Sequence, residues 1–257
     1  MATEPTQQGQ IMAWSETEFW QPELVWREGA AVFAIAAFHA VQYQSDAFRQ
    51  SHMVFPAEVQ ASVSSRQAEY LAGRLLVRYL QQHCGLAVLP LLAGADRCPR
   101  WPPGQIGSLS HSDGLVFAAL QPAGLAGQSV LGVDIECALS QQQQQLLGTE
   151  ILSAPELSLG LAAGLTENAV LTLGFSAKES LYKALYPQCR RVMDFSAAEL
   201  VVITEQHFAL RLTQPWSERW RQGGLFRGRY FWRQHRLYTL VLSDDETDSA
   251  DLMLART

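Results

Sequence analysis

The sequence lacks an excess of positive charge, a long hydrophobic run and a recognisable targeting segment. Its net charge is −6 at pH 7, so it has no overall attraction to nucleic acid or to an anionic membrane. The longest apolar stretch near the N-terminus, Ala30 to Phe38, is too short to span a bilayer, and Met1 to Gln10 lacks the basic start and apolar run of a signal peptide. We therefore expect a soluble, cytoplasmic protein that binds neither nucleic acid nor membranes, and any anion must be held by a local basic cluster.

Cysteine is also scarce, and the spacing of the cysteines bears on metal binding and redox activity. The four cysteines form no C-x-x-C pair, which argues against a structural zinc site or a redox motif and favours free thiols. Hydrophobic residues make up 48% of the chain, and seven residues are tryptophan, a composition typical of a well-buried globular protein. A length of 257 residues suffices for one large domain or for two lobes that share a core.

Hydrophobic patterning predicts two similar α+β halves. In the first half we expect a buried strand over 30–39, a helix from Ser64 or Ser65 to a stop at Gly85, and a strand over 115–120. In the second half we expect a strand over 130–136, a helix over 171–186 ended by Pro187, and four antiparallel strands at 201–203, 208–212, 228–232 and 237–242.

This repeated plan of a long helix followed by strands suggests a pseudo-duplicated α+β fold with the active site between the lobes. We assign residues 1–12 to a disordered tail, 13–125 to an N-terminal lobe and 126–257 to a C-terminal lobe. The Gly/Ala-rich segment 122–128 provides the boundary between the lobes.

Three carboxylates predict a site for a hard cation. Asp134 and Glu136 stand at i and i+2 of an apolar strand, so they point to the same face. Alone, such a pair is most simply two solvated acids at a strand end. Glu179 supplies a third carboxylate, which favours an oxygen-rich Mg²⁺ site, and the absence of a neighbouring histidine or cysteine makes zinc a weaker choice.

Two lysines accompany Glu179 on the same predicted helix. Lys183 follows Glu179 at i+4, a pair that contributes only ~0.2–0.5 kcal/mol on an ordinary helix surface. Lys178 directly precedes Glu179. Beside a cation site, ammonium groups indicate a polyphosphate substrate.

Basic residues in the first half indicate a local anion pocket. Arg66 and Arg74 share one face of the predicted helix, and Arg97 lies in a proline-rich loop. Small residues around Ser110 and His111 predict a Gly/Ser turn whose N–H groups approach a phosphate. A hydrolase triad of Ser110, His111 and Asp113 is improbable, because the three are sequence neighbours and no G-x-S-x-G elbow is present.

These blocks, in their order, resemble the larger, Sfp-type class of 4′-phosphopantetheinyl transferases, closest to the branch containing enterobactin synthase component D. The resemblance covers roughly residues 60 to 245. The segments that carry it are Ser65–Arg74, Arg97–Pro102, Gly107–Ser112, Gly132–Glu136, Phe175–Lys183 and Tyr238–Leu240.

The resemblance implies Mg²⁺-dependent transfer of 4′-phosphopantetheine from coenzyme A to a serine of an apo carrier protein, with release of adenosine 3′,5′-bisphosphate. Asp134, Glu136 and Glu179 would bind Mg²⁺. Coenzyme A would be bound by a basic and polar set: Arg66, Arg74, Arg97, Ser110, His111, Lys178 and Lys183. The catalytic residues would be Glu179, Lys183 and Asp134, with Glu179 or a water activated by Asp134 taking the serine proton.

Two other classes of function remain open on the sequence. One is a non-catalytic module that binds coenzyme A or a carrier protein, although binding alone would not need all three acids. The other is a Mg²⁺-dependent nucleotide phosphohydrolase, which gives no reason for the serine, histidine and arginine blocks. We expect a monomer, and fatty-acid, polyketide and nonribosomal-peptide carriers are all possible partners.

Overall fold

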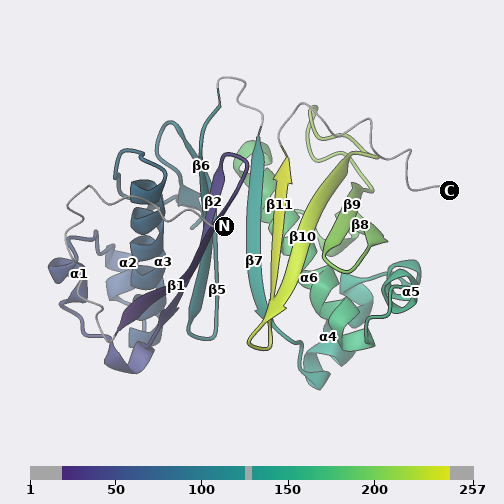
Figure 1. Cartoon of the computed structure of the whole chain (residues 1–257), viewed down its shortest axis with the longest axis horizontal. Coiled ribbons are helices and arrows are strands. Elements are labelled where there is room, and N and C mark those ends of the chain that lie inside the picture. Colours follow the sequence, from purple (N-terminus) through teal and green to yellow (C-terminus); the bar gives the residue numbers. More distant parts are fainter. Residues whose placement is uncertain (1–18, 125–128, 244–257) are drawn as a thin grey trace, which may run out of the picture.

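The computed structural model describes residues 19–124 and 129–243 and shows two α+β lobes side by side (Figure 1). The fold class is as predicted. The expected tail, residues 1–12, lies outside the described residues, as does the part of the expected lobe boundary at 125–128. Each lobe is an antiparallel sheet with one long helix on its outer face.

The N-terminal lobe is a four-stranded sheet, in the order β1-β2-β6-β5, covered by α3. Two short helices and a two-stranded ribbon connect these elements. The elements are β1 (Trp20–Glu28), β2 (Ala31–Phe38), α1 (Ala47–Gln50), α2 (Ala57–Gln60), α3 (Ser64–His83), β3 (Leu92–Ala93), β4 (Pro99–Arg100), β5 (Gln105–Ser112) and β6 (Leu115–Pro122), with a 3-10 turn at Ala40–Gln42.

The C-terminal lobe is a five-stranded sheet, in the order β7-β11-β10-β9-β8, covered by α6. Its remaining helices, α4 and α5, lie beside α6 (Figure 1). The elements are β7 (Val130–Cys137), α4 (Gln141–Ile151), α5 (Ala154–Ala162), α6 (Glu167–Cys189), β8 (Ala198–Ile203), β9 (His207–Leu212), β10 (Leu225–Arg233) and β11 (Arg236–Ser243), with a 3-10 turn at Phe195–Ala197.

The inner faces of the two sheets pack against each other, so the layers run helix, sheet, sheet, helix (Figure 1). Alternating side chains of β2 explain this arrangement: Val32 and Ala34 pack under α3, whereas Phe33 and Ile35 point to the second sheet. Both faces of the strand are buried, which accounts for its continuous apolar sequence. Ion pairs between the lobes, Glu28 with Arg229 and Asp113 with Arg236, lie at the rim of this core.

Two local expectations were wrong. The segment predicted as a Gly/Ser turn is strand β5, whose backbone pairs with β6, and Gly107 makes room there for the ring of Trp101. The helix α6 does not end at Pro187 but continues to Cys189, since a proline so near the C-terminus removes a single hydrogen bond. Separately, the five-glutamine run, Gln141 to Gln145, forms the start of α4, where Ser140 and Gln143 form a capping box.

The two lobes share a plan but not its details. In both, the long helix lies between strands in the sequence rather than before all of them. Among the described residues, no single helix is long and apolar enough to cross a membrane. Taken together, α5 and α6 have the required length and composition, but they are bent by 117° relative to each other.

Gly132 allows α6 to lie close to β7, because a side chain at this position would collide with the helix. A Cβ at Gly132 would lie 1.9 Å from the carbonyl oxygen of Ser180. Gly132→Ala must push α6 away from the sheet, and we expect a loss of about 1–3 kcal/mol or more in the free energy of unfolding, measured by urea denaturation. Gly148→Ala in α4 is the matched control, because its Cβ would make ordinary contacts at 3.6 Å and alanine favours helix. Equal stability of the two variants would contradict this packing.

Candidate functional site

The site begins at the seam where β5 of one sheet lies beside β7 of the other (Figure 1). Because side chains alternate along β5, its serines turn toward β7 while His111 and Leu109 turn toward α3. The Ser108 hydroxyl accepts a hydrogen bond from the backbone N–H of Val133 at 2.9 Å, and Ser110 donates to Asp134 at 2.7 Å. Strand β5 thus places Ser110 beside Asp134 on one face and His111 beside Arg66 of α3 on the other.

Asp134 is the centre of the seam. Its side chain is 1% exposed, and its Oδ1 accepts from Ser110 and from Lys183 Nζ, the latter at 2.5 Å. Its Oδ2 accepts from Ser176 at 2.8 Å. Ser176 and Lys183 stand on α6, so this carboxylate ties that helix to both sheets; the surrounding hydroxyls and the ammonium compensate its burial.

The neighbouring carboxylates have raised pKa values. Burial, then the charge of Asp134, raises the pKa of Glu136 from 4.5 to about 8, although Lys183 opposes the shift. Burial also raises the pKa of Glu179, with Asp134 adding to the shift and Lys183 opposing it. Three acids close enough to repel one another would be stabilised by a cation.

The same acids have the right donor atoms for a metal ion but are not grouped around one position in the described residues. In 19–124 and 129–243, no three carboxylate, histidine or cysteine side chains are arranged as a group that could hold one. Asp134 instead accepts from Lys183, Ser110 and Ser176. The donor set of Asp134, Glu136 and Glu179 is entirely oxygen, which suits Mg²⁺ chemically.

A basic group lies on the other side of β5. Arg66 of α3 contacts both Glu69 and His111, at 3.3 Å from His111 Nε2, and His111 lies 3.0 Å from Glu69. Burial lowers the pKa of His111, and Arg66 and Lys183 lower it further, against the opposing effect of Glu69. The side chains of Arg66 and His111 are about half exposed, so both are open to an anionic ligand.

The structure gives Arg74 mainly structural contacts. Its guanidinium lies 3.6 Å from the ring centroid of Tyr70, and its Nε donates to the Leu91 carbonyl at 3.3 Å. Burial lowers the pKa of Arg74, with a smaller contribution from nearby Arg66. These contacts hold Arg74 against Tyr70 and Leu91 of the N-terminal lobe.

Arg97 lies apart from the basic group, exposed, in the turn between β3 and β4. Its φ is +64°, in the left-handed region. The preceding Asp96 accepts from Tyr186 at 3.0 Å and from Arg190 at 2.9 Å, both at the end of α6. This turn of the N-terminal lobe is therefore attached to the C-terminal lobe.

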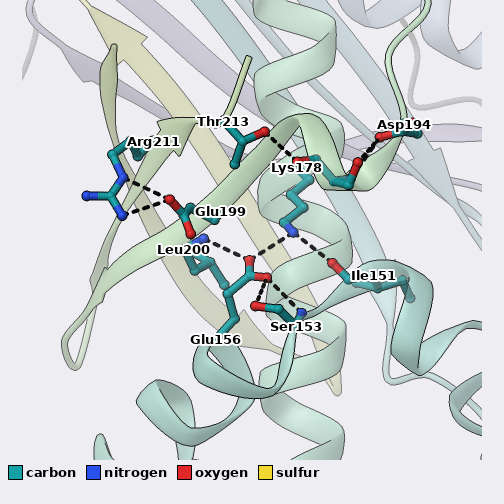
Figure 2. A network of polar contacts seen from close by, with 10 residues as sticks. Ile151, Ser153, Glu156, Lys178, Asp194, Glu199, Leu200, Arg211 and Thr213 are labelled. Carbon is teal, nitrogen blue, oxygen red and sulfur yellow. Dashed lines mark hydrogen bonds and ion pairs between the residues drawn. The ribbon is translucent and has the colours of Figure 1, made fainter. Parts of the chain in front are cut away.

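Lys178 was expected beside the phosphates, but the structure does not bring it there. Its Nζ donates to Glu156 at 2.8 Å and to the Ile151 carbonyl at 2.7 Å (Figure 2). Burial lowers the pKa of Lys178, with Glu156 opposing the shift. The side chain of Lys178 is 5% exposed, against 27% for Lys183, so Lys178 is much less accessible to an incoming phosphate.

A pocket of about 260 Å³ opens beside Glu179. Its wall is mostly apolar, formed by Tyr182, Met193, Phe195 and Trp216, and the chain of Lys178 lines it as well. The ring centroids of Tyr182 and Trp216 are 6.4 Å apart. The pocket is suited to an extended, uncharged part of a ligand whose charged end lies at the seam.

Comparisons with known proteins agree with this geometry. The family model described as 4′-phosphopantetheinyl transferase N-terminal domain matches residues 55–121, and that of the 4′-phosphopantetheinyl transferase superfamily matches residues 130–240. The chain is 35% identical over 167 residues to 4′-phosphopantetheinyl transferase Svp of Streptomyces mobaraensis, covering 63% of this chain and 67% of that one. The chain belongs to the 4′-phosphopantetheinyl transferase superfamily.

Further relatives support the predicted branch of the phosphopantetheinyl transferases. Enterobactin synthase component D of Salmonella typhimurium is 29% identical over 212 residues, which cover 81% of this chain and 87% of the relative. The same-named protein of Escherichia coli K12 is 32% identical over 157 residues, which cover 59% and 72%. The chain is thus a 4′-phosphopantetheinyl transferase, of the class that activates carrier proteins.

Several contacts around the candidate site were not predicted from the sequence. Glu69 could have been found as the i+3 partner of Arg66, and Glu156 as the fourth residue of a Ser-x-x-Glu capping box. Thr239 bonds Ser176 and Ser180 of α6, a contact between residues about 60 positions apart that no local pattern indicates.

The raised pKa of Glu136 predicts a pH-dependent stability in the metal-free transferase. Because its folded pKa of about 8 exceeds the ordinary 4.5, the folded state binds this proton more tightly, and the resulting stability is lost as pH rises from about 4.5 through about 8. Glu136→Gln cannot ionise, so relative to wild type it should become more stable across this window, by up to about 3 kcal/mol. Urea unfolding in a chelating buffer from pH 5 to pH 9 measures the difference.

The exposed Glu150→Gln serves as the control, with no change expected relative to wild type. Parallel stability curves for wild type and Glu136→Gln would contradict the raised pKa.

Proposed function

We propose that the protein transfers 4′-phosphopantetheine from coenzyme A to a serine of an apo carrier protein, with Mg²⁺, and releases adenosine 3′,5′-bisphosphate. One observation carries this proposal. Strand β5 presents His111 toward Arg66 of α3 and the adjacent Ser110 toward Asp134 and Lys183, so two sites for anionic groups stand on opposite sides of a single strand. Coenzyme A has two such groups, its 3′-phosphate and its pyrophosphate.

Each part of coenzyme A has a matching region. Arg66 and His111, both half exposed, would bind the 3′-phosphate through charge-assisted hydrogen bonds. Lys183 would bind the pyrophosphate at the seam. The pocket beside Glu179, with Tyr182 and Trp216 in its wall, would take the pantetheine arm.

Asp134, Glu136 and Glu179 supply the oxygen donors that would hold Mg²⁺, although their side chains would first have to draw together, since among the described residues they do not form such a group in the free protein. When bound there, the ion would neutralise charge on the pyrophosphate and on the leaving group. Lys183, which pairs with Asp134 at 2.5 Å, would then be released to donate to a phosphate oxygen. The raised pKa of Glu136 supports a cation at this place.

The transfer itself needs a base for the carrier serine. Its hydroxyl oxygen attacks the phosphorus next to pantetheine, the bond to the adenosine bisphosphate oxygen breaks, and the serine proton must leave. Both oxygens of Asp134 already accept hydrogen bonds from Ser110, Lys183 and Ser176, which favours Glu179 over Asp134 as the proton acceptor. We assign the proton to Glu179, and Lys183 stabilises the leaving phosphate.

Carrier labelling tests the proposal. Incubation with coenzyme A, Mg²⁺ and an apo carrier protein should raise the carrier mass by one phosphopantetheine, as measured by mass spectrometry. Glu179→Gln should reduce the rate by about 10²–10⁴-fold, with a melting temperature no lower than that of wild type, because burial raises the pKa of Glu179. Glu150→Gln, an exposed carboxylate on α4, is the control.

Three results would refute parts of this assignment. Hydrolysed coenzyme A without labelled carrier would indicate a phosphohydrolase, and no labelling of acyl, peptidyl or aryl carriers despite coenzyme A binding would indicate a binding module. Normal turnover by Glu179→Gln would remove the general base.

Arg66→Ala tests the binding of the 3′-phosphate. Loss of a charged hydrogen bond of about 1.5–3 kcal/mol should raise KM for coenzyme A by tenfold or more and leave KM for dephospho-coenzyme A unchanged. Arg49→Ala, whose side chain is 81% exposed on α1, is the control. An equal effect on both substrates would show that Arg66 binds another part of the molecule.

We also propose a cytoplasmic monomer as the active form. Both lobes of one chain contribute to the seam through Ser110 and Asp134, so a second copy is not needed to complete it.

A further inference from the structure

Lys178 and Glu179 are neighbours in the sequence but face different surroundings. Consecutive helical residues are rotated by about 100°. Both side chains line the pocket, but Glu179 lies within reach of the charges of Lys183 and Asp134, whereas the ammonium of Lys178 pairs with Glu156 of α5. The side chains of Lys178 and Glu156 are each 5% exposed, and their charged atoms are 2.8 Å apart (Figure 2).

Glu156 is fully engaged by the protein. Its Oε2 accepts from the backbone N–H and the hydroxyl of Ser153, both at 2.8 Å, and its Oε1 accepts from the Leu200 N–H at 2.8 Å as well as from Lys178. Both of its oxygens are therefore occupied in the interior, as a buried carboxylate requires. A phosphate approaching Lys178 would have to compete with this carboxylate for the ammonium.

The pair connects four elements. Ile151 ends α4, Glu156 stands in the first turn of α5, Leu200 lies on β8, and Lys178 brings α6 to all three (Figure 2). On another side of α6, Ser176 and Ser180 bond Thr239 of β11 at 2.8 and 2.6 Å. Buried contacts on two sides restrict rotation of the helix about its axis, and this determines the direction of Glu179.

We propose that Lys178 and Glu156 form a buried pair that positions Glu179, and that Lys178 does not bind the phosphates of coenzyme A. The positioning half of this inference rests on the function proposed above for Glu179; the placement of Lys178 does not. Glu156, which no functional motif marks, thereby becomes a positioning residue for the transfer.

The composition of the chain makes a direct test possible, because Lys178 and Lys183 are its only lysines. Protein carrying ¹³C in lysine alone gives two Cε signals, and the one that remains in Lys183→Met belongs to Lys178. Titration with coenzyme A and Mg²⁺ should move the Lys183 signal and leave the Lys178 signal in place. A shift of the Lys178 signal as large as that of Lys183 would overturn the inference.

Kinetics test the positioning role. Lys178→Met and Glu156→Gln each leave a buried charge without its partner and should lower the melting temperature. The double variant Lys178→Met/Glu156→Gln leaves no buried charge at this place, so its melting temperature should lie above those of the two single variants. In the double variant we expect kcat to fall by about 10–100-fold, because Glu179 is less well aligned, while KM for coenzyme A stays within about threefold of wild type, as for a residue that makes no ground-state contact.

Two kinetic outcomes would overturn the proposal. A folded double variant with KM raised more than tenfold would show that Lys178 binds coenzyme A. One with normal kcat and KM would show that the pair only stabilises the fold. If the wild type labels no carrier, the proposed function fails instead, and the lysine spectra still decide where Lys178 lies; they also serve if the double variant does not fold.

Discussion

The site depends on a carboxylate that would be costly to bury alone. Asp134 lies where two sheets and α6 meet, and it receives hydrogen bonds from Ser110 of one lobe and from Ser176 and Lys183 of the other. A charge at 1% exposure is stable only with such partners. The need to satisfy it therefore aligns the lobes, and the alignment brings the basic and acidic groups to adjacent positions.

Charge is divided between the lobes in a way that suits a ligand with two separated anionic groups. Arg66 and His111 belong to the first lobe, and the three acids with Lys183 to the second. Within the second lobe the free protein uses Lys183 to compensate Asp134. On the proposed function, ligand binding would exchange partners within this existing set of charges, which would require less reorganisation than assembling a new one.

Much of this arrangement could be predicted from the sequence, because alternation and helical periodicity are local. They placed Asp134 and Glu136 on one face of a strand and identified both long helices. The turn predicted around His111 was wrong, because glycine and serine occur there to accommodate Trp101 and to bond β7 rather than to bend the chain.

The direction of Lys178 could not be predicted for a different reason. Its neighbour Glu179 and its partner Glu156 are both acids, and periodicity alone does not tell which of them it approaches. The packing of α5 against α6 and β8 decides this, and such packing is a property of the tertiary structure. The hydrogen bond between Thr239 and Ser176 could not be predicted for the same reason, because the two residues are 63 positions apart in the sequence.

The alternation of β5 has a consequence for how proteins of this kind can change. Substitution at Ser110 or His111 alters one half of the site, but insertion of one residue before them would exchange the directions of both, turning the serine to α3 and the histidine to β7. Length changes in this strand should therefore be far less tolerated than point changes. Additions to the chain should be tolerated in connections such as the one between β9 and β10. They leave the spacing of residues within β5 unchanged, and this spacing determines which side chains enter the site.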